Sequence, residues 1–329
     1  MKHISVIGAG AWGTALAQTA AKNADAVTLW ARETDLVGTI NKKRCNETYL
    51  PAVSLNPKIR ATDDLRDAVD GADAVLLVVP AQFLRGVCEQ MRPFWPKGLP
   101  AVVCAKGIEQ KTGKLMGEMI AEALPQAVFA QLSGPTFAEE VALEKPTTVT
   151  LACADEEIGK ELVASLGTAT FRPYYTSDCV SVQIGGAVKN VMAIAAGIVA
   201  GKNLGDNARA ALITRGLAEI SRLAQALGGN PQTLMGLAGL GDLVLTANST
   251  QSRNFTVGLE LGKGRSLRDI LGEKRTVAEG VYTASAVLER AATAGVEMPI
   301  CEGLSRIMND GVPVDDVIAA LFARPLKKE

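Results

Sequence analysis

A glycine-rich turn placed directly after a short apolar segment is the feature that most restricts the fold of this chain. Residues 3–7 (HISVI) have the β-branched composition of a strand, and the turn GAGAWG follows at residues 8–13. Residues 14–22 have a helical composition, and residues 27–30 (VTLW) form a second apolar segment. A strand, a helix and a strand within about 30 residues predict a βαβ unit of the Rossmann type.

The three glycines of this turn indicate a dinucleotide site. In a GxGxxG turn the first glycine (Gly8) permits the tight bend, the second (Gly10) lets the backbone approach a pyrophosphate, and the third (Gly13) lets helix and strand pack closely. The following helix presents free N–H groups and the positive end of its dipole to the phosphates. The alternative is a glycine-rich turn in an α/β protein that binds no nucleotide. The position and spacing of the glycines favour binding.

The end of the second strand bears on which dinucleotide is bound. An acidic residue that holds the ribose 2′-hydroxyl is expected about 20 residues beyond the glycines. Arg32 lies there, where the 2′-phosphate of NADP would be, while Glu33 comes one residue later and could serve NAD. We therefore expect NADP(H) as the cofactor, with NAD(H) also accepted. A solvated arginine at a strand end fits the pattern nearly as well.

Strands and helices continue to alternate along the first 180 residues. Apolar segments typical of buried strands lie at residues 74–79, 101–105, 127–132, 147–153 and 171–176, with helical stretches at 83–91 and 114–123. This alternation predicts a mostly parallel, doubly wound α/β sheet. We expect a dinucleotide-binding Rossmann domain over residues 1–180.

Beyond residue 180 the pattern is almost wholly helical. The helical stretches are rich in Ala, Leu, Ile and Gly and lie near 181–200, 207–227, 231–245, 254–262, 266–271, 281–294, 300–309 and 314–322. We expect an all-α C-terminal domain that binds the substrate, over residues 181–329.

Charge and cysteine content narrow the classes of function. The formal net charge of −1 provides no basic face for nucleic acid. Six cysteines without a CxxC pair indicate packed, reduced thiols in the cytosol rather than a metal site. The strand at residue 3 leaves no room for a signal peptide, so we expect a cytoplasmic protein. The apolar run at 191–200 is too short and too rich in Gly and Ala to predict a membrane span.

A dehydrogenase needs a group that gives and takes a proton, and the residue types present restrict the choice. His3 is the single histidine, and it begins the first strand, at the end of the sheet away from ligands. None of the four tyrosines is followed by lysine four residues later, as the Tyr-x-x-x-Lys pair of short-chain dehydrogenases requires. A lysine, a carboxylate or a bound water must therefore handle the proton.

Lys189 is the strongest candidate for this role. It lies in the segment GGAVKNVMAIAA at residues 185–196, and its helical neighbours three and four residues away are glycine, methionine and alanine. No carboxylate on its own helix can therefore pair with it. A lysine buried among apolar residues is rare, and desolvation favours its neutral form, which can accept a proton. The alternative is a lysine at a helix end whose amine reaches solvent.

Other polar residues follow predicted strands or glycine-rich turns. Lys106 and the segment SGPT at 133–136 come directly after two of the strands, at the edge where open α/β sheets bind ligands. Asp242 follows the turn GLG, and the segment SRN at 252–254 groups a guanidinium with two polar side chains, which suits an anion. The simpler interpretations are a solvated loop lysine, a helix N-cap and a polar loop.

Taken together, these segments resemble the bacterial-type NAD(P)-dependent glycerol-3-phosphate dehydrogenases over essentially the full length of the chain. The matching segments are GAGAWGTALA at 8–17, WAR at 30–32, AKGIE at 105–109, LSGPTFAE at 132–139, KNVM at 189–192, GLGDL at 239–243, SRN at 252–254 and VAEG at 277–280. Their combination and order are far more specific than any one of them.

The resemblance implies a reaction and roles for individual residues. It implies reversible hydride transfer between NAD(P)H and dihydroxyacetone phosphate to give sn-glycerol 3-phosphate for glycerophospholipid synthesis, without a metal, by an enzyme that is commonly a homodimer. It assigns catalysis to Lys189, as proton donor and acceptor, with Lys106 and Asp242. Around the substrate it places Lys106, Gly134, Thr136, Lys189, Asn190, Asp242, Ser252, Arg253 and Asn254. Near the cofactor it places Gly8, Gly10, Ala11, Trp12, Gly13, Arg32, Lys106, Ala138, Arg253, Val277 and Glu279.

Two other classes of function remain open at this point. A β-hydroxyacid dehydrogenase also combines a Rossmann domain with a helical domain and a catalytic lysine. That class expects an asparagine four residues after the lysine, where this chain has Ala193, with Asn190 next to the lysine instead. The second class is an NAD(P)-binding sensor without catalytic activity, which leaves the charged candidates above without a task.

Overall fold

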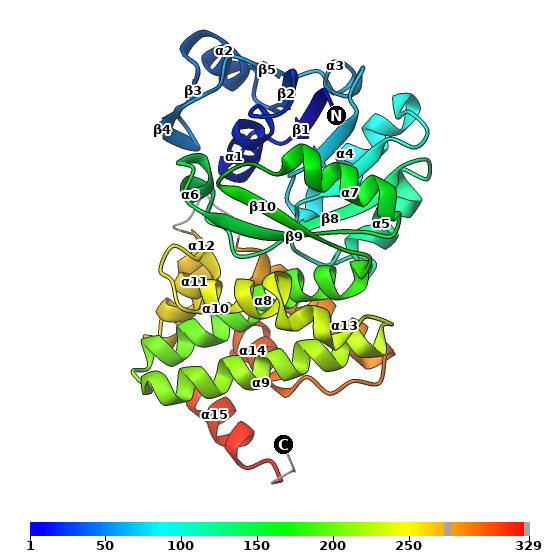
Figure 1. The fold of residues 1–329 in the computed structure, drawn as a ribbon. Helices are drawn as coiled ribbons and strands as arrows, with labels where there is room; N and C mark the ends of the chain where they lie inside the picture. The colour runs from blue at the N-terminus through cyan, green and yellow to red at the C-terminus, as the bar shows by residue number, and fades with distance from the viewer. Residues whose placement is uncertain (273–277, 326–329) are drawn as a thin grey trace. The chain divides into compact units, whose positions relative to one another are not determined.

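The structure is a computed structural model that describes residues 1–272 and 278–325. The chain forms two compact units. The first unit comprises Met1–Lys106 and Lys114–Gln183, and the second comprises Gly107–Gly113 and the chain from Ile184 on. Most of the elements of both are labelled in Figure 1.

The first unit is built on one eight-stranded sheet with the order β10-β9-β8-β7-β6-β1-β2-β5. Neighbouring strands are parallel except for β8 and β9, which are antiparallel. The predicted mostly parallel, doubly wound sheet is therefore confirmed. The strands are β1 (His3–Ile7), β2 (Ala26–Trp30), β5 (Ile59–Thr62), β6 (Ala74–Leu77), β7 (Pro100–Val103), β8 (Val128–Ser133), β9 (Thr147–Cys153) and β10 (Phe171–Thr176).

Helices cover both faces of this sheet, which explains why its central strands are apolar on both sides. One apolar core contains side chains of α1, α2, α6 and α7, and the other contains side chains of α3, α4 and α5. Successive β1 residues alternate between them, because Val6 packs in the first core and Ile7 in the second. These helices are α1 (Ala11–Ala20), α2 (Thr34–Lys43), α3 (Leu65–Val69), α4 (Ala81–Met91), α5 (Met116–Ala123), α6 (Ala138–Ala142) and α7 (Glu156–Leu166).

A small hairpin interrupts the connection from α2 to β5. Its antiparallel strands are β3 (Cys45–Asn46) and β4 (Leu50–Ser54), which pair with each other and not with the main sheet. A short helical turn, η1 (Arg92–Phe94), follows α4.

From Ile184 on, the regular elements of the described part of the second unit are all helices, as the sequence predicts. Its longer helices are α8 (Cys179–Gly201, whose first turn belongs to the first unit), α9 (Gly205–Ala226), α11 (Arg253–Gly262), α13 (Glu279–Thr293), α14 (Pro299–Asn309) and α15 (Val314–Phe322). The shorter ones are η2 (Pro231–Met235), η3 (Leu237–Gly241), α10 (Asp242–Ala247) and α12 (Leu267–Gly272).

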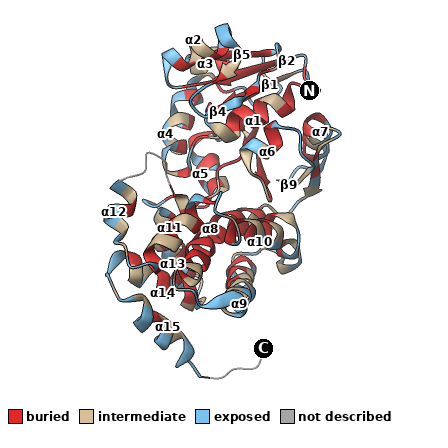
Figure 2. Ribbon diagram, turned by 90° about the vertical axis from the view of Figure 1, so that its left-hand side faces the viewer, coloured by how far each residue is buried: buried red, intermediate tan, exposed pale blue. Residues whose placement is uncertain are grey.

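Helix α8 is the central helix of this unit, and Figure 2 shows it buried along most of its length. Among the described helices it alone is long and apolar enough to cross a membrane, and 78% of its apolar window is buried by other parts of the protein. The helix has 23 residues, so the expectation that its apolar run is too short is wrong. Its burial is that of a core helix.

Glycines bring α8 and α11 into backbone contact. A Cβ atom at Gly197 of α8 would lie 2.1 Å from the carbonyl oxygen of Phe255, and one at Gly258 of α11 would lie 1.9 Å from that of Ile194. Such distances are far inside van der Waals contact, so only glycine permits this approach. The close packing fixes the start of α11 beside the middle of α8.

We expect Gly258→Ala to lower the free energy of unfolding of the second unit by about 1–3 kcal/mol, because the added methyl group must push the two helices apart. The measurement is urea unfolding followed by circular dichroism. Gly86→Ala is the matched control, since Gly86 lies in α4 and a Cβ there meets no described atom within 4 Å. Because alanine has a higher helix propensity than glycine, Gly86→Ala is expected to raise the free energy of unfolding by up to about 1 kcal/mol. Equal effects of both substitutions would contradict the backbone contact.

Candidate functional site

The glycine-rich turn between β1 and α1 has the shape that a dinucleotide requires. Gly8 has φ +118°, and its N–H donates to the carbonyl of Trp30 at 3.0 Å. A Cβ at Gly13 would lie 1.8 Å from the carbonyl oxygen of Gly8, whereas one at Gly10 would meet no described atom within 4 Å. The first and third glycines therefore permit the bend and the close packing of helix on strand, and the second leaves open backbone for a phosphate.

Helix α1 begins at this open backbone. Its N-cap is Gly10, which has no side chain to cap the helix, and the first turn of this described helix contains no acidic residue. Ala11 and Trp12, predicted near the cofactor, are the first two helical residues. N–H groups and the positive helix end together suit a pyrophosphate, so the turn fits the dinucleotide.

Arg32 lies just beyond the carboxyl end of β2, with 81% of its side chain exposed. Its guanidinium contacts the carboxylate of Glu33 at 3.2 Å. An ion pair this exposed contributes little to stability, so it holds Arg32 in place only weakly. The guanidinium is thus accessible to an incoming group at the end of the second strand.

Three predicted residues meet where β7 and β8 end. The ammonium of Lys106 donates to the carbonyl of Gly134 at 2.9 Å, and the hydroxyl of Thr136 donates to the same carbonyl at 3.3 Å. Gly134 has φ +154°, and a Cβ there would lie 2.9 Å from the Cα of Val149, so glycine is required at this position. Ala138, also predicted near the cofactor, begins α6 and packs against the apolar core.

Lys189 lies on the part of α8 that is buried, and only 7% of the residue is exposed. Its Nζ lies 3.0 Å from a carboxylate oxygen of Asp242 and donates to the hydroxyl of Thr246 at 2.8 Å. The Thr246 hydroxyl in turn donates to the same Asp242 oxygen at 3.2 Å. Helix α8 itself contains no carboxylate, as its sequence shows, and the partner of Lys189 comes from α10 instead.

Close packing of η3 against α8 brings Asp242 within reach of Lys189. A Cβ at Gly185, one turn before Lys189 on α8, would lie 2.6 Å from the carbonyl oxygen of Ala238 in η3. Because η3 leads directly into α10, the absence of a side chain at Gly185 brings the start of α10 up to α8. Asp242 is the first residue of α10 and is 1% exposed.

The three residues of the segment Ser252-Arg-Asn254, at the start of α11, have different surroundings. Ser252 is the N-cap, and its Oγ accepts from the N–H of Phe255 at 3.2 Å. Asn254 is buried, and its Nδ2 donates to the Oδ1 of Asn190 on α8 at 2.9 Å. Arg253 is the one exposed residue of the three. Ser252 and Asn254 thus stabilise the start of α11 and its packing on α8. Their contact with substrate stays a prediction.

Asn254 also reaches the beginning of α13. Its Oδ1 accepts from the N–H of Gly280 at 3.0 Å. A Cβ at Gly280 would lie 2.6 Å from the carbonyl oxygen of Asn190, so α13 can start here only with glycine. Glu279, predicted near the cofactor, is the first residue of α13 and is half-buried. Val277, from the same prediction, lies outside the described residues.

The predicted residues thus form one group in each unit. In the first unit they gather at the glycine-rich turn and at the ends of β2, β7 and β8. In the second they gather where α8, α10, α11 and α13 meet. Sequence reasoning missed two buried residues that complete these groups. They are Thr246, one helical turn after Asp242, and Asn46, which contacts the turn at Ala9 and Thr14.

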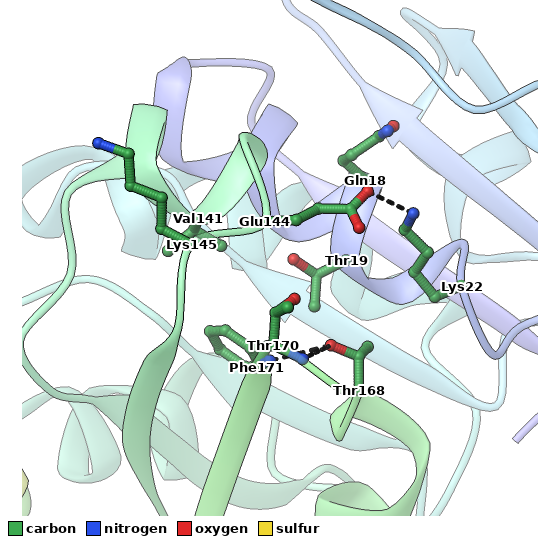
Figure 3. A pocket seen from close by; sticks show the side chains of 9 residues that line it. All are labelled: Gln18, Thr19, Lys22, Val141, Glu144, Lys145, Thr168, Thr170 and Phe171. Carbon is green, nitrogen blue, oxygen red and sulfur yellow. Dashed lines mark hydrogen bonds and ion pairs between the residues drawn. The ribbon is translucent and has the colours of Figure 1, made fainter.

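Figure 3 shows a pocket in the first unit that contains none of the predicted residues. It lies between the later part of α1, the end of α6 and the start of β10, and an ion pair between Lys22 and Glu144 crosses it. Its cavity volume is about 10 Å³, roughly the room of one water molecule. We assign it no role, because the groups above have the chemistry and this pocket does not have the space.

The cysteines and potential metal ligands give no competing site. Burial raises the pKa of the Cys104 thiol, which lies two residues before Lys106, so that thiol stays protonated at neutral pH. Burial also raises the pKa of Cys88 to about 12. Among the described residues there is no cluster of three or more His, Cys, Asp or Glu side chains that could hold a metal ion.

Comparison with known proteins gives one consistent result. The model of the NAD-dependent glycerol-3-phosphate dehydrogenase N-terminus matches residues 3–159, and that of the C-terminus matches residues 178–319. A glycerol-3-phosphate dehydrogenase (NAD(P)+) of Rhodospirillum rubrum is 57% identical over 99% of this chain and 94% of its own length. One of Parvibaculum lavamentivorans is 53% identical over 100% and 98%. The crystal structure of glycerol-3-phosphate dehydrogenase from Coxiella burnetii superposes with a TM-score of 0.93 at 38% identity, over 98% of this chain and 99% of that one.

The buried pair of Lys189 and Asp242 predicts strong energetic coupling. Removing one partner by Lys189→Met or Asp242→Asn leaves the other charge buried without this counter-ion, which costs roughly 3–5 kcal/mol of unfolding free energy. The double variant buries no charge at this position and is expected to lose less than the sum of the two single losses. Urea unfolding of all four proteins measures the coupling.

An exposed pair that joins the last residue of α2 to the turn of the β3–β4 hairpin is the control for this cycle. Lys43 and Glu47 lie 3.0 Å apart with side chains 60% and 54% exposed. Their cycle, Lys43→Met with Glu47→Gln, is expected to give a coupling of at most about 0.5 kcal/mol. Additive losses at Lys189 and Asp242 would show that the two charges are not coupled.

Proposed function

The chain belongs to the NAD-dependent glycerol-3-phosphate dehydrogenase family, and on that premise we propose that it reduces dihydroxyacetone phosphate to sn-glycerol 3-phosphate, reversibly, with NADPH. The single observation that carries the proposal is the buried cluster of Lys189, Asp242 and Thr246, placed on adjacent helices. A buried ammonium is costly to a fold, so its presence in a family of ketone reductases supports a role in proton transfer.

Lys189 is the proton donor in the reductive direction. NADPH supplies the hydride when it is bound, and negative charge then grows on the ketone oxygen. The Lys189 ammonium stabilises that charge and transfers a proton from Nζ to the oxygen, which leaves a neutral amine. In the oxidative direction the neutral amine takes the proton from the hydroxyl group. Asp242 and Thr246 hold Nζ in place, and Asp242 compensates its positive charge.

Residues 1–180 form the dinucleotide-binding domain and residues 181–329 the substrate domain. The first domain carries most of the residues assigned to the cofactor, with the pyrophosphate on the turn at Gly8, Gly10 and Gly13 and the ribose near Arg32. The second carries Lys189 and most of the residues assigned to the substrate. Support comes from the open backbone at Gly10 and from the polar group around α8. The other residues assigned to the cofactor are Ala11, Trp12, Lys106, Ala138, Arg253, Val277 and Glu279.

Recognition of the substrate phosphate rests mainly on Arg253. It is exposed at the N-terminal end of α11, where a guanidinium and the helix dipole both attract an anion. Lys106, Gly134 and Thr136 are assigned to the substrate from the first unit. Asn190, Asp242, Ser252 and Asn254 complete the set from the second.

We further propose that the protein acts in the cytoplasm as a homodimer and that its product supplies the backbone of glycerophospholipids. The buried, protonated thiols suit a reducing compartment. The dimer and the metabolic role follow from the family resemblance.

The purified chain is expected to oxidise NADPH when dihydroxyacetone phosphate is added, and Lys189→Met is expected to lower kcat by roughly 10²–10⁴. The loss arises because methionine can neither donate a proton nor stabilise the alkoxide. NADPH absorbance at steady state gives kcat, and nucleotide binding measured without substrate shows that the variant still holds the cofactor. The double variant with Asp242→Asn is expected to be destabilised by less than the sum of the two single losses, and turnover is not expected to return.

Three outcomes distinguish the classes of function. Turnover of dihydroxyacetone phosphate by the wild type supports the proposal, and turnover of a β-hydroxyacid instead identifies the related dehydrogenase class. Binding of NADPH without turnover of either identifies a sensor. Near-normal kcat in folded Lys189→Met would remove Lys189 from the mechanism.

Arg32→Ala is expected to reduce kcat/KM for NADPH roughly tenfold to a hundredfold and to change that for NADH much less. The reason is the loss of one hydrogen bond between two charged groups, because the 2′-phosphate of NADPH is an ionised acceptor and the 2′-hydroxyl of NADH is not. Initial rates with both nucleotides in wild type and variant measure the effect. Arg172→Ala is the control for loss of an exposed arginine, because Arg172 lies on β10, an edge strand of the sheet that is far in strand order from β2. An equal loss with both nucleotides would mean that Arg32 does not select NADPH.

A further inference from the structure

Asn46 is a buried amide that no step of the proposed reaction uses. It belongs to the β3–β4 hairpin, and its exposed fraction is 0%. Its Nδ2 donates to the carbonyl of Ala9 and to the Oγ1 of Thr14, both at 2.8 Å. Its Oδ1 accepts from the N–H of Tyr49 at 3.1 Å. A carbonyl can only accept and a peptide N–H can only donate, so these partners determine the orientation of the amide.

The carbonyl that Asn46 holds lies inside the glycine-rich turn. Ala9 stands between Gly8 and Gly10, and the described part of the chain contains no cis peptide bond. In a planar trans peptide the carbonyl and the following N–H point in opposite directions. Because Asn46 takes the carbonyl of Ala9, the N–H of Gly10 is turned away from Asn46. Gly10 is also the glycine with open space around it.

The hairpin that carries Asn46 is itself attached to α1. Gln18 of α1 donates to the carbonyl of Ser54 at 3.4 Å and accepts from the N–H of Asn56 at 2.9 Å. The hairpin is therefore bonded near the end of α1 through Gln18, and to the start of α1 and the turn before it through Asn46. This arrangement gives a rigid base from which one amide can set the shape of the turn.

We propose that Asn46 is a positioning residue for the dinucleotide, which holds the carbonyl of Ala9 inward so that the turn receives the pyrophosphate. The inference rests on the proposed function, because it takes the turn as the cofactor site. NADH and NADPH share the pyrophosphate, so Asn46 acts equally on both. Arg32, in contrast, acts on the 2′-phosphate alone.

Two substitutions test this proposal by nucleotide binding in the absence of substrate. Asn46→Asp keeps an oxygen for the N–H of Tyr49 but places a second acceptor against the carbonyl of Ala9. Asn46→Leu removes the donor without adding charge. Both are expected to raise the Kd for NADH and for NADPH on the order of tenfold, with an unchanged ratio between the two nucleotides. Fluorescence titration of the reduced nicotinamide measures both constants.

Asn41, an exposed residue of α2, offers a control for the same change of contact in the same unit. Its Nδ2 donates to the carbonyl of Ala61 at 2.9 Å, and its Oδ1 accepts from the N–H of the same residue at 2.8 Å. Asn41→Asp thus changes the same kind of contact and adds the same charge away from the turn. It is expected to lower the unfolding temperature and to leave both Kd values unchanged.

The outcomes separate this inference from the proposed function. If the wild type binds neither nucleotide, the proposed function fails. If the wild type binds and both Asn46 variants bind equally well, the inference is overturned. It is also overturned if Asn41→Asp weakens binding as much, or if only Asn46→Asp does so, because charge alone then explains the loss. Circular dichroism confirms folding, and Asn46→Ser replaces a variant that does not fold.

Discussion

The buried ion pair between Lys189 and Asp242 is the interaction on which the second unit depends. Taking two charges out of water costs several kcal/mol each, and their attraction repays this only with good geometry and additional hydrogen bonds. Thr246 supplies one such bond to each partner, at 2.8 Å to Lys189 and at 3.2 Å to Asp242. In other proteins, replacing a buried ion pair by well-packed apolar side chains is often neutral or stabilising. The cost of burying the pair therefore supports the role in proton transfer that we propose for Lys189.

A second buried charge in the same unit shows the contrasting case. Glu219 of α9 accepts from the N–H groups of Ile300 and Cys301 in the first turn of α14, and burial raises the pKa of its carboxyl to about 7. Since the pKa is raised, stability from this group is greatest below about pH 4.5 and falls as the pH rises towards 7. The carboxyl caps a helix from outside, and among the described residues Arg222 lowers its pKa without forming an ion pair as close as that of Lys189 with Asp242. Burial alone therefore does not identify a catalytic group.

The parts of the fold that follow from local patterns could be predicted from the sequence, and the parts that depend on long-range contact could not. The β1–α1–β2 unit can be predicted because its three glycines have the spacing of a dinucleotide-binding turn. The central strands can be predicted because strands that are buried on both faces appear in the sequence as continuous apolar segments. The β3–β4 hairpin gives no comparable signal, since its strands are short and β4 buries only Leu50 and Val53. The partner of Lys189 lies on another helix, so helical periodicity around Lys189 can only report that its own helix has none.

The segment at 252–254 shows why a polar cluster in the sequence does not specify an anion site. In a chain read alone, a serine, an arginine and an asparagine are equally suited to a phosphate. In the fold, Ser252 caps the start of α11 by accepting a hydrogen bond from the N–H of Phe255. The buried amide of Asn254 needs hydrogen-bond partners, and it finds one in Asn190 of α8. Arg253 has neither task and is exposed at the positive end of α11. The charge that can select a phosphorylated substrate in this segment therefore belongs to one residue, which the two neighbours orient by fixing the backbone on either side.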